Sequence, residues 1–144
     1  MSHTARISAI KITDIAALRL AVQDLQKMGV VCSLVENDTP RAYYNNQEGM
    51  GRAPYVLKLD GAKYDIGFYN EADVKVYEPR TDFFGGSVEN ILGVKDGTDQ
   101  GRLGKLFNLY SANAVINTAI RKGYKHSRFI NPTTGLTDRV ELVA

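Results

Sequence analysis

The stretch from Tyr55 to Asn70, YVLKLDGAKYDIGFYN, constrains the fold of this chain more than any other segment. Apolar residues alternate with polar or small ones in two runs, first at Tyr55, Leu57 and Leu59 and then at Tyr64, Ile66 and Phe68. An Asp-Gly pair between two such runs is a strong signal for a β-hairpin. The segment therefore predicts two antiparallel strands, over 55–59 and 64–69, with one apolar face.

Two segments have the helical period instead. In DIAALRLAVQDLQKMG (14–29), apolar residues recur every three or four positions, which places them on one helical face. Thr13 or Asp14 can cap this helix, and Gly29 can end it. The second helix is RLGKLFNLYSANAVINTAIRKG (102–123), which Gly123 ends. The expected buried residues are Ile15, Leu18, Val22, Leu25 and Met28 in the first helix, and Leu106, Leu109, Ala112, Val115, Ile116 and Ala119 in the second.

Shorter β-type segments complete the order of elements. Strands are predicted over 5–12, 30–36 and 74–79, the last ended by Pro79, and over YKHSRFI (124–130) and TDRVELV (137–143) after the second helix. The order is β-α-β-β-β-(loop)-α-β-β. It predicts one α+β domain over 1–144, with a mostly antiparallel sheet and both long helices on one of its faces.

Composition places the chain among ordinary globular proteins. It has 144 residues, 44% of them hydrophobic, and its apolar runs are too short for a membrane span. No secretory signal is recognisable at the start, so we expect a soluble cytoplasmic protein. Cys32, the single cysteine, lies in VVCSLVE and is expected to be a packed thiol.

Four pieces of sequence occur in an order that resembles the Ycf35 family, also called DUF1257. They are MSH with DIAALRLAVQDL, YDIGF at 64–68, KLFNLYSANAVINTAIRKGY at 105–124, and the closing RVELV, and they cover about half of the chain. The resemblance implies a small protein of algal plastids, cyanobacteria or bacterial viruses, with no established activity. The chain departs from the family in having no tryptophan and in extra residues at 80–104.

Candidate functional residues fall in three regions. Two Gly-rich or Asn-rich stretches, 37–54 and 80–101, are predicted as long loops, which often carry binding. The third region runs from Arg102 to Arg128 and contains no carboxylate. A nucleic acid or an acidic partner is the candidate ligand of this region, but helix capping and a solvated strand face explain the cations more simply, and this structural account is preferred. Its candidate residues are Arg102, Lys105, Arg121, Lys122, Tyr124, Lys125 and Arg128.

Two further residues are possible ligand contacts. Asp65 points away from the apolar face of its strand, where it can meet a ligand or simply pair with Lys58 or Lys63. His126 is one of only two histidines, and neither belongs to a metal-binding motif. No catalytic residue, metal ligand or cofactor is predicted.

These observations favour a non-catalytic accessory or adaptor protein that binds an unidentified protein partner. A nucleic-acid-binding protein that uses the basic segment 121–128 is the alternative, and a virion component of a bacterial virus is another. An enzyme whose residues converge from separate loops stays open, and a pocket containing Asp65 or His126 would favour it. Homo-oligomerisation is expected because a small antiparallel sheet leaves unpaired edges.

Overall fold

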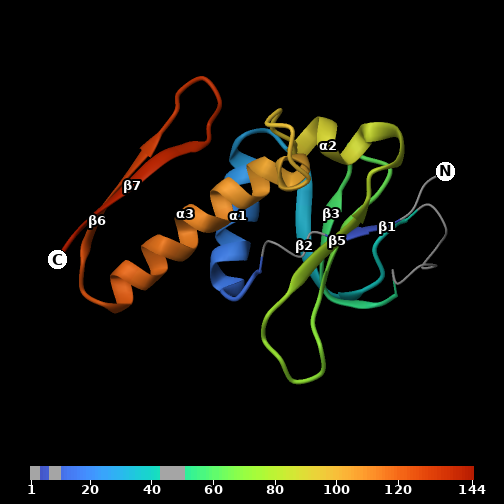
Figure 1. The fold of residues 1–144 in the computed structure, drawn as a ribbon, viewed down its shortest axis with the longest axis horizontal. Coiled ribbons are helices and arrows are strands. Elements are labelled where there is room, and N and C mark those ends of the chain that lie inside the picture. Colours follow the sequence, from blue (N-terminus) through green and yellow to red (C-terminus); the bar gives the residue numbers. More distant parts are fainter. Residues whose placement is uncertain (1–3, 7–10, 43–50) are drawn as a thin grey trace.

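The computed structural model describes residues 4–6, 11–42 and 51–144, and in this part of the chain it has the predicted α+β fold. Five strands form an antiparallel sheet in the order β1-β5-β4-β3-β2 (Figure 1). Their bounds are β1 Thr4–Arg6, β2 Cys32–Asp38, β3 Ala53–Leu59, β4 Ile66–Tyr69 and β5 Glu78–Asp82.

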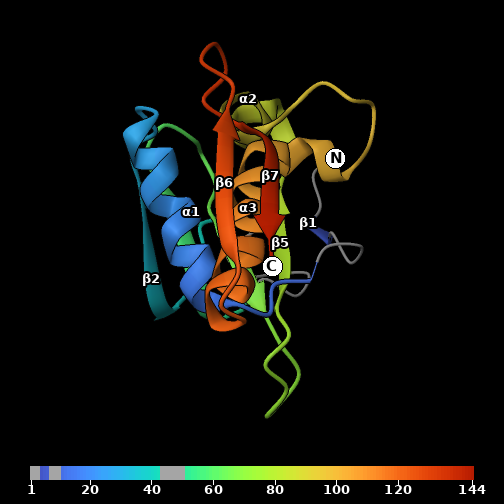
Figure 2. The same cartoon turned by 90° about the vertical axis from the view of Figure 1, so that its left-hand side faces the viewer.

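The helices α1 (Ile15–Lys27) and α3 (Gly104–Arg121) pack on one face of this sheet and against each other. A short helix, α2 (Ser87–Leu92), lies beyond one end of the strands. The last two strands, β6 (Lys125–Ile130) and β7 (Thr137–Val143), form a separate two-stranded sheet on the outer side of α3. Figures 1 and 2 show the resulting layers, in the order hairpin, helices and sheet.

The core lies between the helices and the sheet. The predicted apolar face of the hairpin is confirmed, because Leu57, Ile66 and Phe68 are fully buried and belong to the core cluster. In α1, Leu18 and Leu25 are fully buried on the predicted face. Burial of each such side chain contributes about 1.5–3 kcal/mol to folding.

The ends of α1 follow the predicted signals. Asp14 is the N-cap, and its Oδ1 accepts a hydrogen bond from the Ala17 amide at 3.0 Å. Gly29 follows the helix with a φ of 92°, in the left-handed region that glycine adopts without strain. The end of α3 is similar, since Gly123 has a φ of 76°.

Several boundaries differ from the predictions, and three of these differences have a structural reason or change an element. The strand predicted over 74–79 corresponds to β5, which begins later, at Glu78, and continues to Asp82. Pro79 does not end this strand but is its second residue, close to the strand start, where a missing N–H is tolerated. The return strand begins at Ile66 rather than Tyr64, because the Asp65 amide donates to the carbonyl of Arg41, which lies outside the sheet. The segment 80–101, predicted as a long loop, contains the end of β5 and the helix α2. Of the first predicted strand, 5–12, residues 7–10 lie outside the described residues, Ala5 and Arg6 belong to β1, and Ile12 forms an isolated bridge with Tyr77.

Polar bonds between layers hold the two helices and the hairpin in place. The Tyr110 hydroxyl accepts hydrogen bonds from the amides of Thr13 and Asp14, at 2.9 and 3.1 Å, and so connects α3 to the start of α1. The Asn108 side chain accepts from the amide of Thr137 and donates to its carbonyl, at 2.8 and 2.9 Å. The first residue of β7 is therefore fixed to α3.

The bonds to the Tyr110 hydroxyl give a direct test. Tyr110→Phe leaves two amides at the start of α1 without their acceptor, so the free energy of unfolding should fall by about 1–3 kcal/mol. Urea denaturation followed by circular dichroism measures the loss. Tyr124→Phe, which removes an exposed hydroxyl, is the matched control. Equal stability of the two variants would show that the Tyr110 bonds contribute nothing.

Candidate interaction surface

Asp65 serves the architecture of the sheet. Its side chain is completely buried, and Oδ1 accepts from Arg41 Nη2 at 2.7 Å and from the Leu59 amide at 3.2 Å. The Arg41 amide donates to Oδ2 at 2.9 Å, and Lys58 Nζ lies 3.5 Å from the same oxygen. The carboxylate thus ties the segment after β2 to the β3–β4 connection.

The same contacts determine the charge state of Asp65. Burial alone would raise the pKa of its carboxyl, but the hydrogen bonds from the Arg41 side chain and from the amides of Arg41 and Leu59 outweigh burial and lower the pKa. Asp65 is therefore an internal anion with internal partners. Of its two predicted lysine partners, Lys58 is the one in contact, whereas Arg41 was not foreseen.

The predicted basic residues do not form one surface. Arg102 lies at the start of α3, 3.8 Å from Glu89 and over the Phe83 ring, and Lys105 is in the first turn. Arg121 lies at the opposite end, about 24 Å from Lys105 at the α-helical rise. The sequence stretch without carboxylates is therefore divided between two ends of the molecule.

Arg128 is held inside the fold. Its side chain is only 17% exposed, its Nη2 lies 3.1 Å from Asp24 Oδ2, and its Nε donates to Thr137 Oγ1 at 2.9 Å. The same Asp24 oxygen accepts from Asn113 Nδ2 at 2.9 Å. Three elements meet at this carboxylate, namely α1, α3 and the hairpin, so the positive charge of Arg128 is neutralised within the protein.

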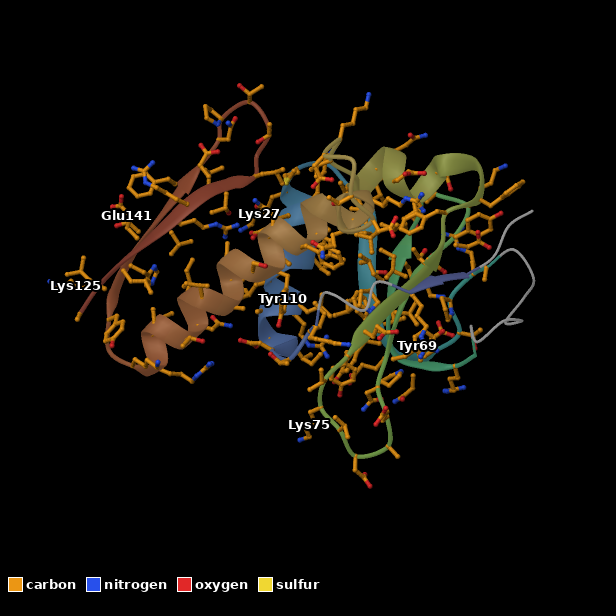
Figure 3. All side chains as sticks on the ribbon, in the orientation of Figure 1. Lys27, Tyr69, Lys75, Tyr110, Lys125 and Glu141 are labelled. Carbon is orange, nitrogen blue, oxygen red and sulfur yellow. The ribbon has the colours of Figure 1, made fainter. Side chains whose placement is uncertain are left out.

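Four of the predicted residues remain together at the end of α3. Lys122, Tyr124, Lys125 and His126 follow one another through the turn into β6, and all four are exposed. Figure 3 places Lys125 at the end of the molecule far from Lys27 and Lys75. We call residues 120–126 the cationic end. Arg121 belongs to it and is also exposed, although Asp14 lies 4.0 Å from its guanidinium.

Exposed apolar side chains gather on the same part of the chain. In the described residues, seven of the twelve exposed large apolar side chains lie between 115 and 143, which we call the arm. Ile120 is 59% and Val143 61% exposed. Contiguous apolar patches are typical of interaction surfaces, whereas isolated exposed apolar residues are common on any protein. The seven are Val115, Ile120, Tyr124, Phe129, Ile130, Leu142 and Val143.

The second predicted loop lines a pocket of about 810 Å³. Lys95 and Arg102 face it together with Glu89 and Asp99, so the charges at its walls are mixed. The first predicted loop, 37–54, is described only outside 43–50. Two smaller pockets open on the described surface, and neither Asp65 nor His126 lines any of the three.

Among the residues that the structure describes, no three His, Cys, Asp or Glu side chains lie close enough together to bind a metal ion. Cys32 is buried, as predicted, and burial, with a smaller contribution from the charge of Asp60, raises the pKa of its thiol. No helix in this part of the chain has both the length and the apolar character to span a bilayer.

Comparison of the chain with protein-family models, with curated proteins and with solved structures found no match. The resemblance to the Ycf35 family therefore stays a prediction from the sequence. The class of protein defined by the structure is an α+β domain with a projecting, partly apolar arm.

The role of Asp65 can be tested by removing its charge. In Asp65→Asn, Arg41 and Lys58 lose their anion and one amide loses its acceptor, so the free energy of unfolding at pH 7 should fall by about 2–4 kcal/mol. Urea denaturation measures the change. Asp73→Asn is the matched control, because Asp73 is exposed and has a φ of 63°, which asparagine also tolerates. A loss no larger than that of the control would contradict the anchoring role.

The free energy of unfolding should also depend on pH because of Asp65. Its pKa is lower in the folded than in the unfolded protein, so its charge stabilises the fold fully above the unfolded pKa of about 4. This contribution is lost as pH falls through the lower, folded pKa. Denaturation curves between pH 7 and pH 2 should therefore decline less steeply for Asp65→Asn than for the wild type. Parallel declines would show that another group causes the acid sensitivity.

Proposed function

We propose that the protein is a non-catalytic accessory or adaptor protein that binds another protein through the arm. The observation that carries this proposal is the concentration of exposed apolar side chains on the arm beside the cationic end. Burial of such side chains supplies the affinity of most protein interfaces, and charges at the rim select the partner. The partner surface should therefore be apolar and rimmed with carboxylates.

A nucleic acid is the second candidate ligand. Three cations, Arg121, Lys122 and Lys125, flank Tyr124 in the sequence, and Tyr124 is 40% exposed. Cations can neutralise phosphates while an exposed ring stacks on a base. However, Arg128 is paired with Asp24, so its positive charge does not contribute to the cationic end. Binding of a nucleic acid would also leave the exposed apolar residues of the arm without a role. We therefore place protein binding first.

Capture from a lysate of the native cells, with and without nuclease, separates the two candidates. The bait is the tagged wild type, and Lys122→Glu/Lys125→Glu is the test variant, since neither lysine has a structural ion pair among those described. We expect a protein partner that survives nuclease and falls by about tenfold or more with the variant. Mass spectrometry identifies and quantifies it.

The matched control is Lys27→Glu/Lys75→Glu, which makes the same charge change at two exposed lysines outside the arm (Figure 3). Equal loss in both variants would point to net charge rather than to the arm. Retention of the partner by the Lys122→Glu/Lys125→Glu variant would contradict binding at the cationic end. Disappearance of all partners with nuclease would instead favour the nucleic-acid candidate.

A further inference from the structure

The β6–β7 hairpin has two edges that pair with no other described strand. Unpaired edges invite pairing with another strand, and a two-stranded sheet alone is marginally stable. The hairpin depends on α3 for support on one face, while Phe129 and Val143 are exposed. Extension of this sheet by a further strand would satisfy the backbone of one edge.

The edges differ in their suitability for pairing with a second copy of the chain. β6 contains the cationic residues Lys125 and Arg128 and no carboxylate. Antiparallel pairing of two β6 strands therefore forms no opposite-charge pair in any register, and opposite-charge pairs are what stabilise charged positions across strands.

The β7 edge, in contrast, can form opposite-charge pairs with a second β7 strand. Arg139 and Glu141 are spaced two residues apart, so they lie on the same face of the strand, and both side chains are more than half exposed. A two-fold arrangement centred on Val140 places Arg139 opposite Glu141 of the partner subunit, and Glu141 opposite Arg139 of the partner subunit. Two opposite-charge pairs form, and no like-charge pair does.

Neighbouring registers lose this match. If the two-fold arrangement is centred on Arg139, the arginines of the two copies lie opposite each other. If it is centred on Glu141, the two glutamates lie opposite each other. A centre between two residues is excluded, because residues directly opposite each other point to the same face of a sheet, whereas neighbouring residues in a strand point to opposite faces. Charge complementarity therefore selects both the β7 edge and a single register within it.

Contacts within one chain are compatible with this register. Arg139 Nε lies 3.0 Å from Glu141 Oε1, and the Arg139 guanidinium carbon lies 3.9 Å from the centre of the Phe129 ring, so these side chains already point along the same exposed face. Thr137 is engaged by Asn108, which leaves the strand after it for pairing.

We infer that two copies of the chain associate by antiparallel pairing of their β7 strands about Val140, which forms a continuous four-stranded sheet. Such a dimer carries two cationic ends. This inference goes beyond the proposed function and does not require it, because the dimer forms without any other partner.

Analytical ultracentrifugation of the purified protein over a concentration series tests the inference. The wild type should shift from 15.9 kDa towards twice this mass as concentration rises. Arg139→Glu or Glu141→Arg alone creates two like-charge pairs and should raise the dissociation constant by about tenfold or more. The double variant Arg139→Glu/Glu141→Arg exchanges the charges and should restore the dimer.

Circular dichroism verifies that all variants are folded, which is expected because both residues are exposed. Lys125→Glu, on the other strand of the hairpin, is the matched control and should leave the dimer intact. A wild type that stays monomeric at about 0.5 mM would overturn the inference. A dimer insensitive to Arg139→Glu, or not recovered in the double variant, would do so too. Partner capture is read in a separate experiment, so the two proposals can fail independently.

Discussion

Packing of α3 from two sides is the constraint on which the rest of the structure depends. One side of the helix buries Leu106 and Leu109 in the core, while Asn108 reaches the hairpin on the other. Tyr110 and Asn113 connect the same helix to α1 through polar bonds. Because α3 serves both sheets, its position determines where the hairpin projects and how much of the hairpin is covered. The exposed arm is a direct result of this double role.

Much of the fold could be predicted because local signals and tertiary packing agree. The period of apolar residues located α1 and α3, and alternation located β3 and β4. Predictions were wrong where a long-range contact decided the boundary, as at Asp65, whose partner Arg41 lies 24 positions earlier in the chain. Nor does alternation reveal which sheet a strand joins. Nothing in KHSRFI or TDRVELV indicates that these strands leave the main sheet.

The candidate surface was predictable only in part. Absence of carboxylates from Arg102 to Arg128 is visible in the sequence, but a helix separates the two ends of that segment, and Asp24 neutralises its last cation. The exposed apolar residues of the arm could not be identified, since Leu142 or Val143 in a strand is ordinarily read as core. Exposure depends on how far a strand extends beyond the helix that supports it. Only tertiary structure contains that information.

The Asp24–Arg128 link has a consequence for motion. It and the Asn108–Thr137 bonds are the polar attachments described between the strands of the hairpin and the helices, and both lie away from the core between α1, α3 and the main sheet. Leu136, between the two strands, packs against that core, so separation of the hairpin from α3 exposes only part of it, at a free energy below that of global unfolding. Amide hydrogens of β6 and β7 would exchange with solvent through this local opening, whereas those of β3 and β4 require unfolding of the whole domain. The arm is thus the part of the chain whose shape can adjust to what it meets.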